Sequence, residues 1–106
     1  MRPLWLKTEG VAEIWFGDNN TVRWYINSVG GGHFEPSVSN QNDLGSSTKR
    51  VRSLYLGQFL EAEEMTAPAA PSSNRVRLYA EDNGSGKTRL MALFATGAAQ
   101  QIAIEP

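Results

Sequence analysis

The chain has 106 residues, with 10 Lys and Arg against 11 Asp and Glu, a formal net charge of −1, and no cysteine. This charge balance argues against a dedicated nucleic-acid binder, and the lack of cysteine excludes disulfides and thiolate metal sites. Frequent glycine and the lack of a continuous helical pattern predict an all-β chain of one domain or two very small ones.

The first ten residues leave two interpretations open. They contain Pro3, Gly10 and an apolar trio, Leu4 to Leu6, and they are either an arm that docks on a neighbour or a first edge strand. The segment is charged too early for a signal peptide, and no stretch approaches the ~20 apolar residues of a membrane span. We expect a protein made in the cytoplasm without membrane insertion.

A β-hairpin is predicted next. Residues 11–16 and 21–26 are β-branched and aromatic runs, and the four residues between them, Gly-Asp-Asn-Asn, accept positive φ. Residues 27–32 then interrupt the strand with three glycines. His33 begins a short third strand that Pro36 ends.

The stretch from Asp43 to Gly57 predicts a polar turn followed by a strand. Asp43 and Gly45 favour the turn. From Arg50 to Leu56 the side chains alternate between two half-polar faces, which favours a strand that needs a partner surface.

This stretch, DLGSSTKRVRSLYLG, resembles the D-L-G-S-S-x-x-R-x-(R/K)-x-L-Y-L motif of bacteriophage tail-fibre, head-fibre and related virion proteins. It departs from that motif at Val51, where an aromatic residue is common, and at Asn42, where the family often has Tyr. Residues 16–24 and 77–106 also look like segments of phage structural proteins. The resemblance implies a virion location, an intertwined homotrimer with strands of three chains around an apolar axis, and other capsid or tail proteins as partners.

A linker is predicted to divide the chain. Residues 58–65 are ambiguous between a helical turn and extended structure, and extended structure is favoured because so short a helix is marginal in water. Residues 66–73, with Pro68 and Pro71 among small residues, favour a semi-rigid extended linker. We therefore expect an N-terminal β unit at 1–65, a linker at 66–73 and a C-terminal β unit at 74–106.

The C-terminal unit is predicted to be a three-stranded meander. Its strands are residues 75–80, 88–95 and 98–104, joined by glycine-marked turns. The unit falls short of the ~40 residues below which chains without disulfides or metals usually need oligomerisation. The expected oligomer interface consists of Leu54, Tyr55, Leu56, Leu90, Leu93, Phe94, Ile102 and Ile104. Similar spacings around the turns of the two units also suggest a duplication.

Enzymatic chemistry is not expected. Gly84 to Thr88 resembles part of a phosphate-binding loop, but Glu81 occupies the position of the first glycine, so a hairpin turn is favoured. His33 is the single histidine, and it suits a metal site only if three copies meet on a trimer axis. The aspartates lie in predicted turns and not as a catalytic pair. We therefore expect no catalytic residue, no cofactor and no metal.

The aromatic residues of the first hairpin are the remaining candidates. Trp15, Trp24 and Tyr25 fall on both faces of the predicted sheet, so at least one ring points away from any single core. Such a ring packs on a neighbouring subunit or virion protein, or stacks on a host-surface glycan. The sequence therefore favours a non-enzymatic virion structural protein, with a carbohydrate-binding attachment module as the alternative.

Overall fold

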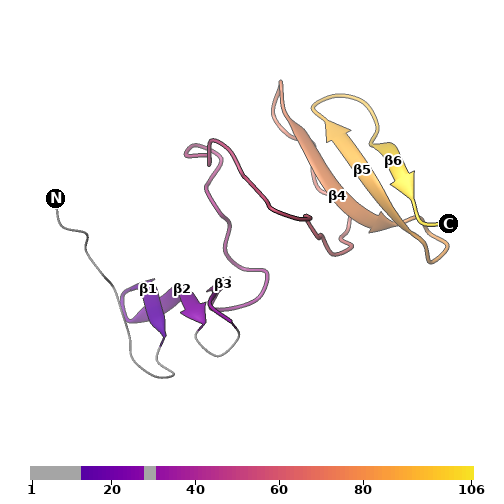
Figure 1. The fold of residues 1–106 in the computed structure, drawn as a ribbon. Helices are drawn as coiled ribbons and strands as arrows, with labels where there is room; N and C mark the ends of the chain where they lie inside the picture. The colour runs from indigo at the N-terminus through magenta and orange to yellow at the C-terminus, as the bar shows by residue number, and fades with distance from the viewer. Residues whose placement is uncertain (1–12, 28–30) are drawn as a thin grey trace. The chain divides into compact units, whose positions relative to one another are not determined.

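The computed structural model describes residues 13–27 and 31–106, and it divides the chain into two compact units (Figure 1). The first unit is Met1–Leu54 and the second is Tyr55–Pro106. The division falls within the motif, whereas the sequence placed the change of unit at the 66–73 linker. The proposed arm or edge strand at residues 1–10 lies outside the described residues.

The first unit contains an antiparallel sheet in the order β1-β2-β3. Its strands are β1 (Ile14–Asp18), β2 (Thr21–Asn27) and β3 (His33–Pro36). Asn19 and Asn20 have φ angles of 46° and 61°, the conformation of the tight turn that matches the twist of a β-hairpin. The predicted hairpin and the short third strand are confirmed.

The second unit contains an antiparallel sheet in the order β4-β5-β6. Its strands are β4 (Val76–Asp82), β5 (Thr88–Phe94) and β6 (Gln100–Ile104). In the β4–β5 turn, Asn83 Oδ1 accepts hydrogen bonds from the backbone N–H groups of Ser85 (2.8 Å) and Lys87 (3.2 Å). The meander and the all-β class are confirmed, and the described residues contain no helix.

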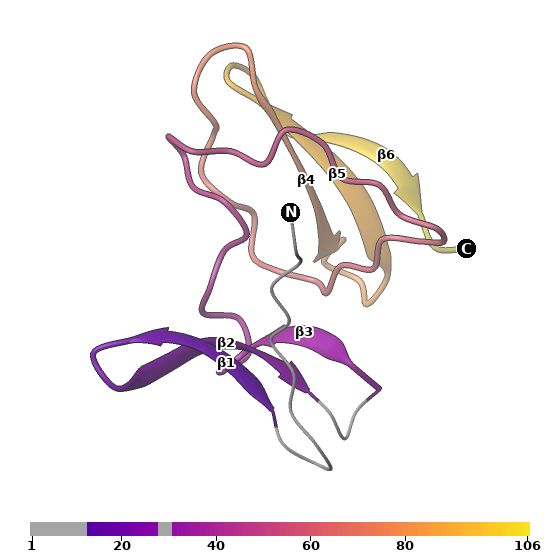
Figure 2. The ribbon, with the colours of Figure 1, turned by 60° about the vertical axis from the view of Figure 1, so that its left-hand side comes forward.

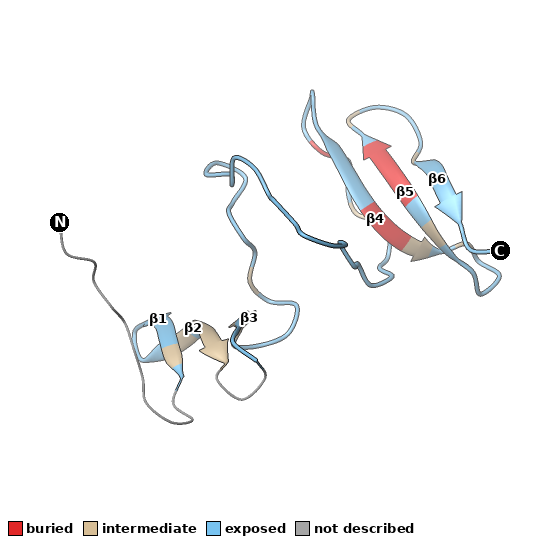
Figure 3. Ribbon diagram, in the orientation of Figure 1, coloured by how far each residue is buried: buried red, intermediate tan, exposed pale blue. Residues whose placement is uncertain are grey.

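The buried side chains gather on β4 and β5 of the second sheet (Figure 3). Tyr79, Met91 and Leu93 form the core cluster, with Ala99 packed against it. The segment before β4 runs close to this sheet (Figure 2), where the Met65 N–H donates to the Ala80 carbonyl over 2.9 Å. This contact belongs to an isolated parallel bridge between Glu64 and Ala80, so the preference for extended structure at 58–65 is confirmed.

The predicted linker does not run free of the second sheet. Arg77 Nη1 donates to the Ala69 carbonyl over 2.7 Å, and Pro71 is buried. Proline and alanine lack polar side-chain atoms, so they pack against an apolar surface without leaving a group unsatisfied. Residues 66–73 therefore belong to the second unit.

The strand predicted from Arg50 to Leu56 is wrong, because the structure assigns no strand there. The turn before it does form, with Gly45 at φ 82° and the Ser46 N–H donating to the Lys49 carbonyl over 2.9 Å. Alternation alone does not make a strand, since a strand needs a partner for its backbone groups. None of the described strands pairs with this segment, and its side chains are exposed.

Candidate interaction site

The first sheet has an aromatic face and a mixed face. Strand register places Phe16 opposite Trp24, and Trp15 opposite Tyr25, so Trp24 and Trp15 lie on opposite faces. On the aromatic face, Trp24 stacks on Phe34 with ring centroids 5.0 Å apart, and Phe16 meets Phe34 edge-on at 5.8 Å. Trp24 is therefore a packing residue of this small cluster, and Trp15 remains available for an external contact.

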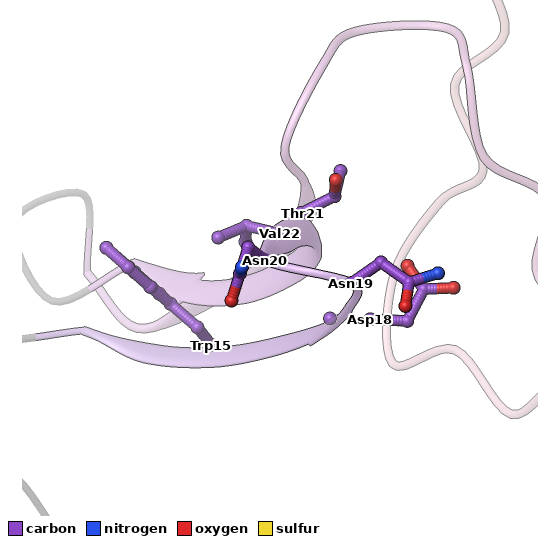
Figure 4. A pocket seen from close by; sticks show the side chains of 7 residues that line it. Trp15, Asp18, Asn19, Asn20, Thr21 and Val22 are labelled. Atoms are coloured by element: carbon purple, nitrogen blue, oxygen red, sulfur yellow. The ribbon is translucent and has the colours of Figure 1, made fainter.

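Trp15 borders an open pocket of about 420 Å³ at the β1–β2 turn. Its ring lies on β1, with Asn20 and Val22 beside it and Asp18 and Asn19 at the turn (Figure 4). Trp15 is 65% exposed, and its Nε1 donates to Glu13 Oε2 over 2.8 Å. The pocket thus combines one exposed ring with amide, hydroxyl and carboxylate groups.

Gly17 determines how the chain turns at this pocket. A bulge separates Phe16 from Gly17, and a Cβ atom at Gly17 would lie 2.1 Å from the Thr21 carbonyl oxygen.

The bulge leaves Arg23 out of the β1–β2 register. Its carbonyl accepts from the Ser37 N–H (2.8 Å) and from Asn42 Nδ2 (2.7 Å), so the residue that departs from the family motif at 42 anchors the chain to β2.

Tyr25 lies on the mixed face beside two carboxylates. Glu35 is directly opposite it on β3 and accepts a hydrogen bond from Asn27 Nδ2 over 3.0 Å. The Glu35 carboxylate raises the pKa of Tyr25 above its ordinary value, with smaller contributions from desolvation and from Glu13. Negative charge beside the phenol disfavours the phenolate, so Tyr25 is a neutral hydrogen-bonding group in this face at physiological pH.

The second sheet has one side on which the large apolar side chains are all exposed. We name it the open face: it consists of Val76, Leu78, Leu90 and Phe94, all exposed. The register sets Val76 opposite Phe94 and Leu78 opposite Ala92, so these side chains share one side of the sheet. Tyr79, Met91 and Leu93 occupy the other side, which forms the core.

The predicted interface residues divide according to these two sides. Leu90 and Phe94 lie on the open face, whereas Leu93 is only 8% exposed and contributes to the core of its own unit. Ile102 lies at the β6 bulge and Ile104 pairs with Arg89, and both are exposed. Leu54, Tyr55 and Leu56 lie in the strand-free segment, and Tyr55 is 93% exposed.

Sequence reasoning missed Val76 and Leu78 as members of the open face. The alternation along β4 contains the necessary signal. Val76 and Leu78 lie on one side of the strand, and Arg77 and Tyr79 lie on the other side, which forms the core. The signal was incomplete without the packing of residues 66–73, which determines which side of the sheet is covered.

The other sequence candidates belong to different units of the chain. Gly84 and Gly86 lie in the β4–β5 hairpin turn, and His33 is exposed on β3. Within residues 13–27 and 31–106, no group of three or more His, Asp or Glu side chains is placed to hold a metal ion. A bilayer-spanning helix is not found in the part of the chain that the structure describes.

The comparisons with known proteins add no relative. No family model, curated protein or solved structure was found to match this chain.

Proposed function

We propose that the chain is a non-enzymatic structural protein of a bacteriophage virion. It assembles as a homotrimer into a fibre, spike or capsid-decoration component and attaches to other virion proteins. The motif at Asp43–Gly57 supports the virion assignment by resemblance. The observation that carries the assembly is the open face.

The physical argument is a shortage of buried apolar surface. The core cluster of the second unit comprises only three residues, and every large apolar side chain of the open face is solvent-exposed. A contiguous apolar patch of this kind marks an interaction surface in a folded protein. In the trimer, the open faces of the three copies pack against one another around the three-fold axis, so each copy buries the apolar side chains of the others.

The test is a charge placed in the open face. Leu78→Lys puts an ammonium where Leu78 is 63% exposed, and we expect the trimer to dissociate because a buried, unpaired charge is costly. Val38→Lys is the matched control, since Val38 is 51% exposed in the first unit. Native mass measurement of both variants decides the matter: a Leu78→Lys protein that remains trimeric would contradict the proposal.

The pocket beside Trp15 supports a second function, a carbohydrate-binding module that acts in attachment. An exposed aromatic ring next to amide and hydroxyl groups suits the apolar face and the hydroxyl groups of a sugar. Glycan-array binding that is lost in Trp15→Ala and kept in Val38→Ala would favour this function. Absence of glycan binding by the wild-type trimer would contradict the carbohydrate-binding function and favour the structural role.

A further inference from the structure

A row of three side chains crosses the first sheet on its mixed face. Trp15 of β1 lies opposite Tyr25 of β2, and Tyr25 lies opposite Glu35 of β3. Opposite residues of antiparallel strands share a face, and neighbouring strands lie about 4.8 Å apart. The row therefore places an indole ring, a phenol and a carboxylate side by side across roughly 10 Å.

This row carries negative charge that no cation of the described residues neutralises. Glu13 accepts the hydrogen bond of Trp15 Nε1 over 2.8 Å, so a second carboxylate lies at the edge of the indole ring. Glu35 accepts from Asn27 Nδ2 over 3.0 Å, and this amide donor is neutral. In the part of the chain that the structure describes, neither Glu13 nor Glu35 takes part in an ion pair.

Tyr25 and Arg23 show the same excess of negative charge from two directions. The carboxylates of Glu35 and Glu13 both raise the pKa of the Tyr25 phenol, as negative charge beside a phenol does. Arg23 is the basic residue of β2, but its Nε pairs with Asp18 Oδ1 over 2.9 Å. Its guanidinium is thus engaged at the β1–β2 turn and leaves the two glutamates unpaired.

The aromatic members of the row also favour a cation. The face of an aromatic ring attracts positive charge through its quadrupole, and tryptophan does so most strongly. Trp15 is 65% exposed, and its bond to Glu13 holds the edge of the ring. Tyr25 and Glu35 are half-buried beside it. A positive group above the row therefore meets ring faces and a carboxylate at the same time.

The openness of the row indicates which kind of molecule carries that positive group. The pocket beside Trp15 is lined by residues of the β1–β2 turn and includes neither Tyr25 nor Glu35. Small ligands bind in concave sites that bury most of their surface, and the row offers them no such enclosure. A side chain presented by a protein surface does not need a pocket, because the surrounding surface supplies the rest of the contact.

We propose that Trp15, Tyr25 and Glu35 form a docking site for an arginine side chain of a partner protein. A guanidinium is planar, so it stacks on the rings and donates hydrogen bonds to the carboxylate in one pose. Glu35 has acceptor capacity for this, since a carboxylate offers about four lone-pair sites. The site lies in the first unit and uses no residue of the open face, so it goes beyond the proposed assembly.

The test titrates the intact wild-type chain with the peptide acetyl-Gly-Arg-Gly-amide. NMR follows the Trp15 Nε1–H signal and the Tyr25 ring signals. We expect both to shift and to saturate with a dissociation constant on the order of 1 mM, as suits one exposed contact. The same peptide with citrulline keeps the shape of arginine without its charge, and it should bind about tenfold more weakly.

Two variants locate the contact. Glu35→Gln removes the charge and keeps the size of the side chain, and Trp15→Ala removes the ring. Each should weaken binding of the arginine peptide about threefold. Glu61→Gln is the matched control, because it makes the same change at an exposed carboxylate of the second unit and should bind as the wild type does.

Several outcomes would overturn the proposal. These are an arginine peptide that shifts neither signal, a citrulline peptide that binds equally well, and equal affinity in wild type and Glu35→Gln. Glucosamine that shifts the same signals at lower concentration than the peptide would assign the row to a cationic sugar instead. The citrulline comparison uses the wild-type chain alone, so it decides the matter even where a variant unfolds. None of these results depends on subunit number, which Leu78→Lys tests separately.

Discussion

At the turn between β1 and β2, the backbone approaches itself so closely that only glycine fits at position 17. The gap between a Cβ atom there and the Thr21 carbonyl oxygen would be 2.1 Å. Because a Cβ atom cannot approach a carbonyl oxygen this closely, a larger residue at position 17 must displace the backbone of the hairpin.

We therefore expect Gly17→Ala to destabilise the first unit by about 2 kcal/mol. Amide hydrogen exchange should show lost protection in β1 and β2. Gly57→Ala is the control, because nothing lies within 4 Å of a Cβ atom there. Unchanged protection of β1 and β2 in Gly17→Ala would show that the bulge geometry is not required.

Tyr25 makes a prediction about pH. Its pKa is raised above the ordinary value of 10.0, chiefly by the Glu35 carboxylate. A raised pKa in the folded state means that the associated stability is present below the ordinary value and is lost as the pH rises through the raised one. Unfolding at high pH should therefore become easier over that window.

Glu35→Gln removes the main cause of the shift. The Tyr25 pKa should fall back toward its ordinary value, and the loss of stability in that alkaline window should shrink. Titration of the Tyr25 ring signals by NMR checks this, with Tyr55 as an exposed comparison. A Tyr25 pKa that does not fall in the variant would show that Glu35 is not its cause.

Among the elements, the β4–β5 turn combines a backbone hydrogen bond from the Asn83 N–H to the Lys87 carbonyl (2.9 Å) with side-chain bonds of Asn83. Asn83 Oδ1 accepts two backbone N–H groups within the turn, and such local bonds compensate donors that the strands leave unpaired. Asn83→Ala should therefore lower the stability of the second unit by about 1 kcal/mol. Asn83→Asp keeps the acceptor oxygen and should lose less. Equal thermal unfolding midpoints for wild type and Asn83→Ala would contradict this role.

The elements also show which parts of the fold local sequence determines. Turn residues such as Asn19 and Gly84 supply the positive φ that hairpins need, so the six strands of the described residues lie within or close to the predicted ranges. The strand predicted at Arg50–Leu56 failed because pairing depends on a partner elsewhere, and alternation says nothing about where that partner is. The packing of Pro71 against the second sheet is likewise a tertiary contact without a local signal.

The candidate sites were predictable to a similar extent. Alternation correctly put the neighbouring Trp24 and Tyr25 on opposite faces, because strand faces follow directly from the period of two. Alternation also puts Leu90 and Leu93 on opposite sides of β5, but it does not show which side is covered, because that depends on what packs against the sheet. The pocket beside Trp15 depends on the bulge at Gly17, which only the three-dimensional register reveals.

At the scale of the whole molecule, the central claim is that the chain is stable only with other copies of itself. Among the described residues, each sheet has three strands and the large buried side chains lie in the second sheet. The proposed trimer covers the open face. The suggested duplication of the two units stays a prediction.

Thermal unfolding of the wild-type chain across a dilution series, from micromolar to nanomolar, tests this claim most directly. When folding is coupled to association, dilution lowers the midpoint by mass action. We expect the unfolding temperature to fall steadily with dilution, and analytical ultracentrifugation to detect no folded monomer. A lone subunit that melts cooperatively at the same temperature at nanomolar concentration would contradict the account.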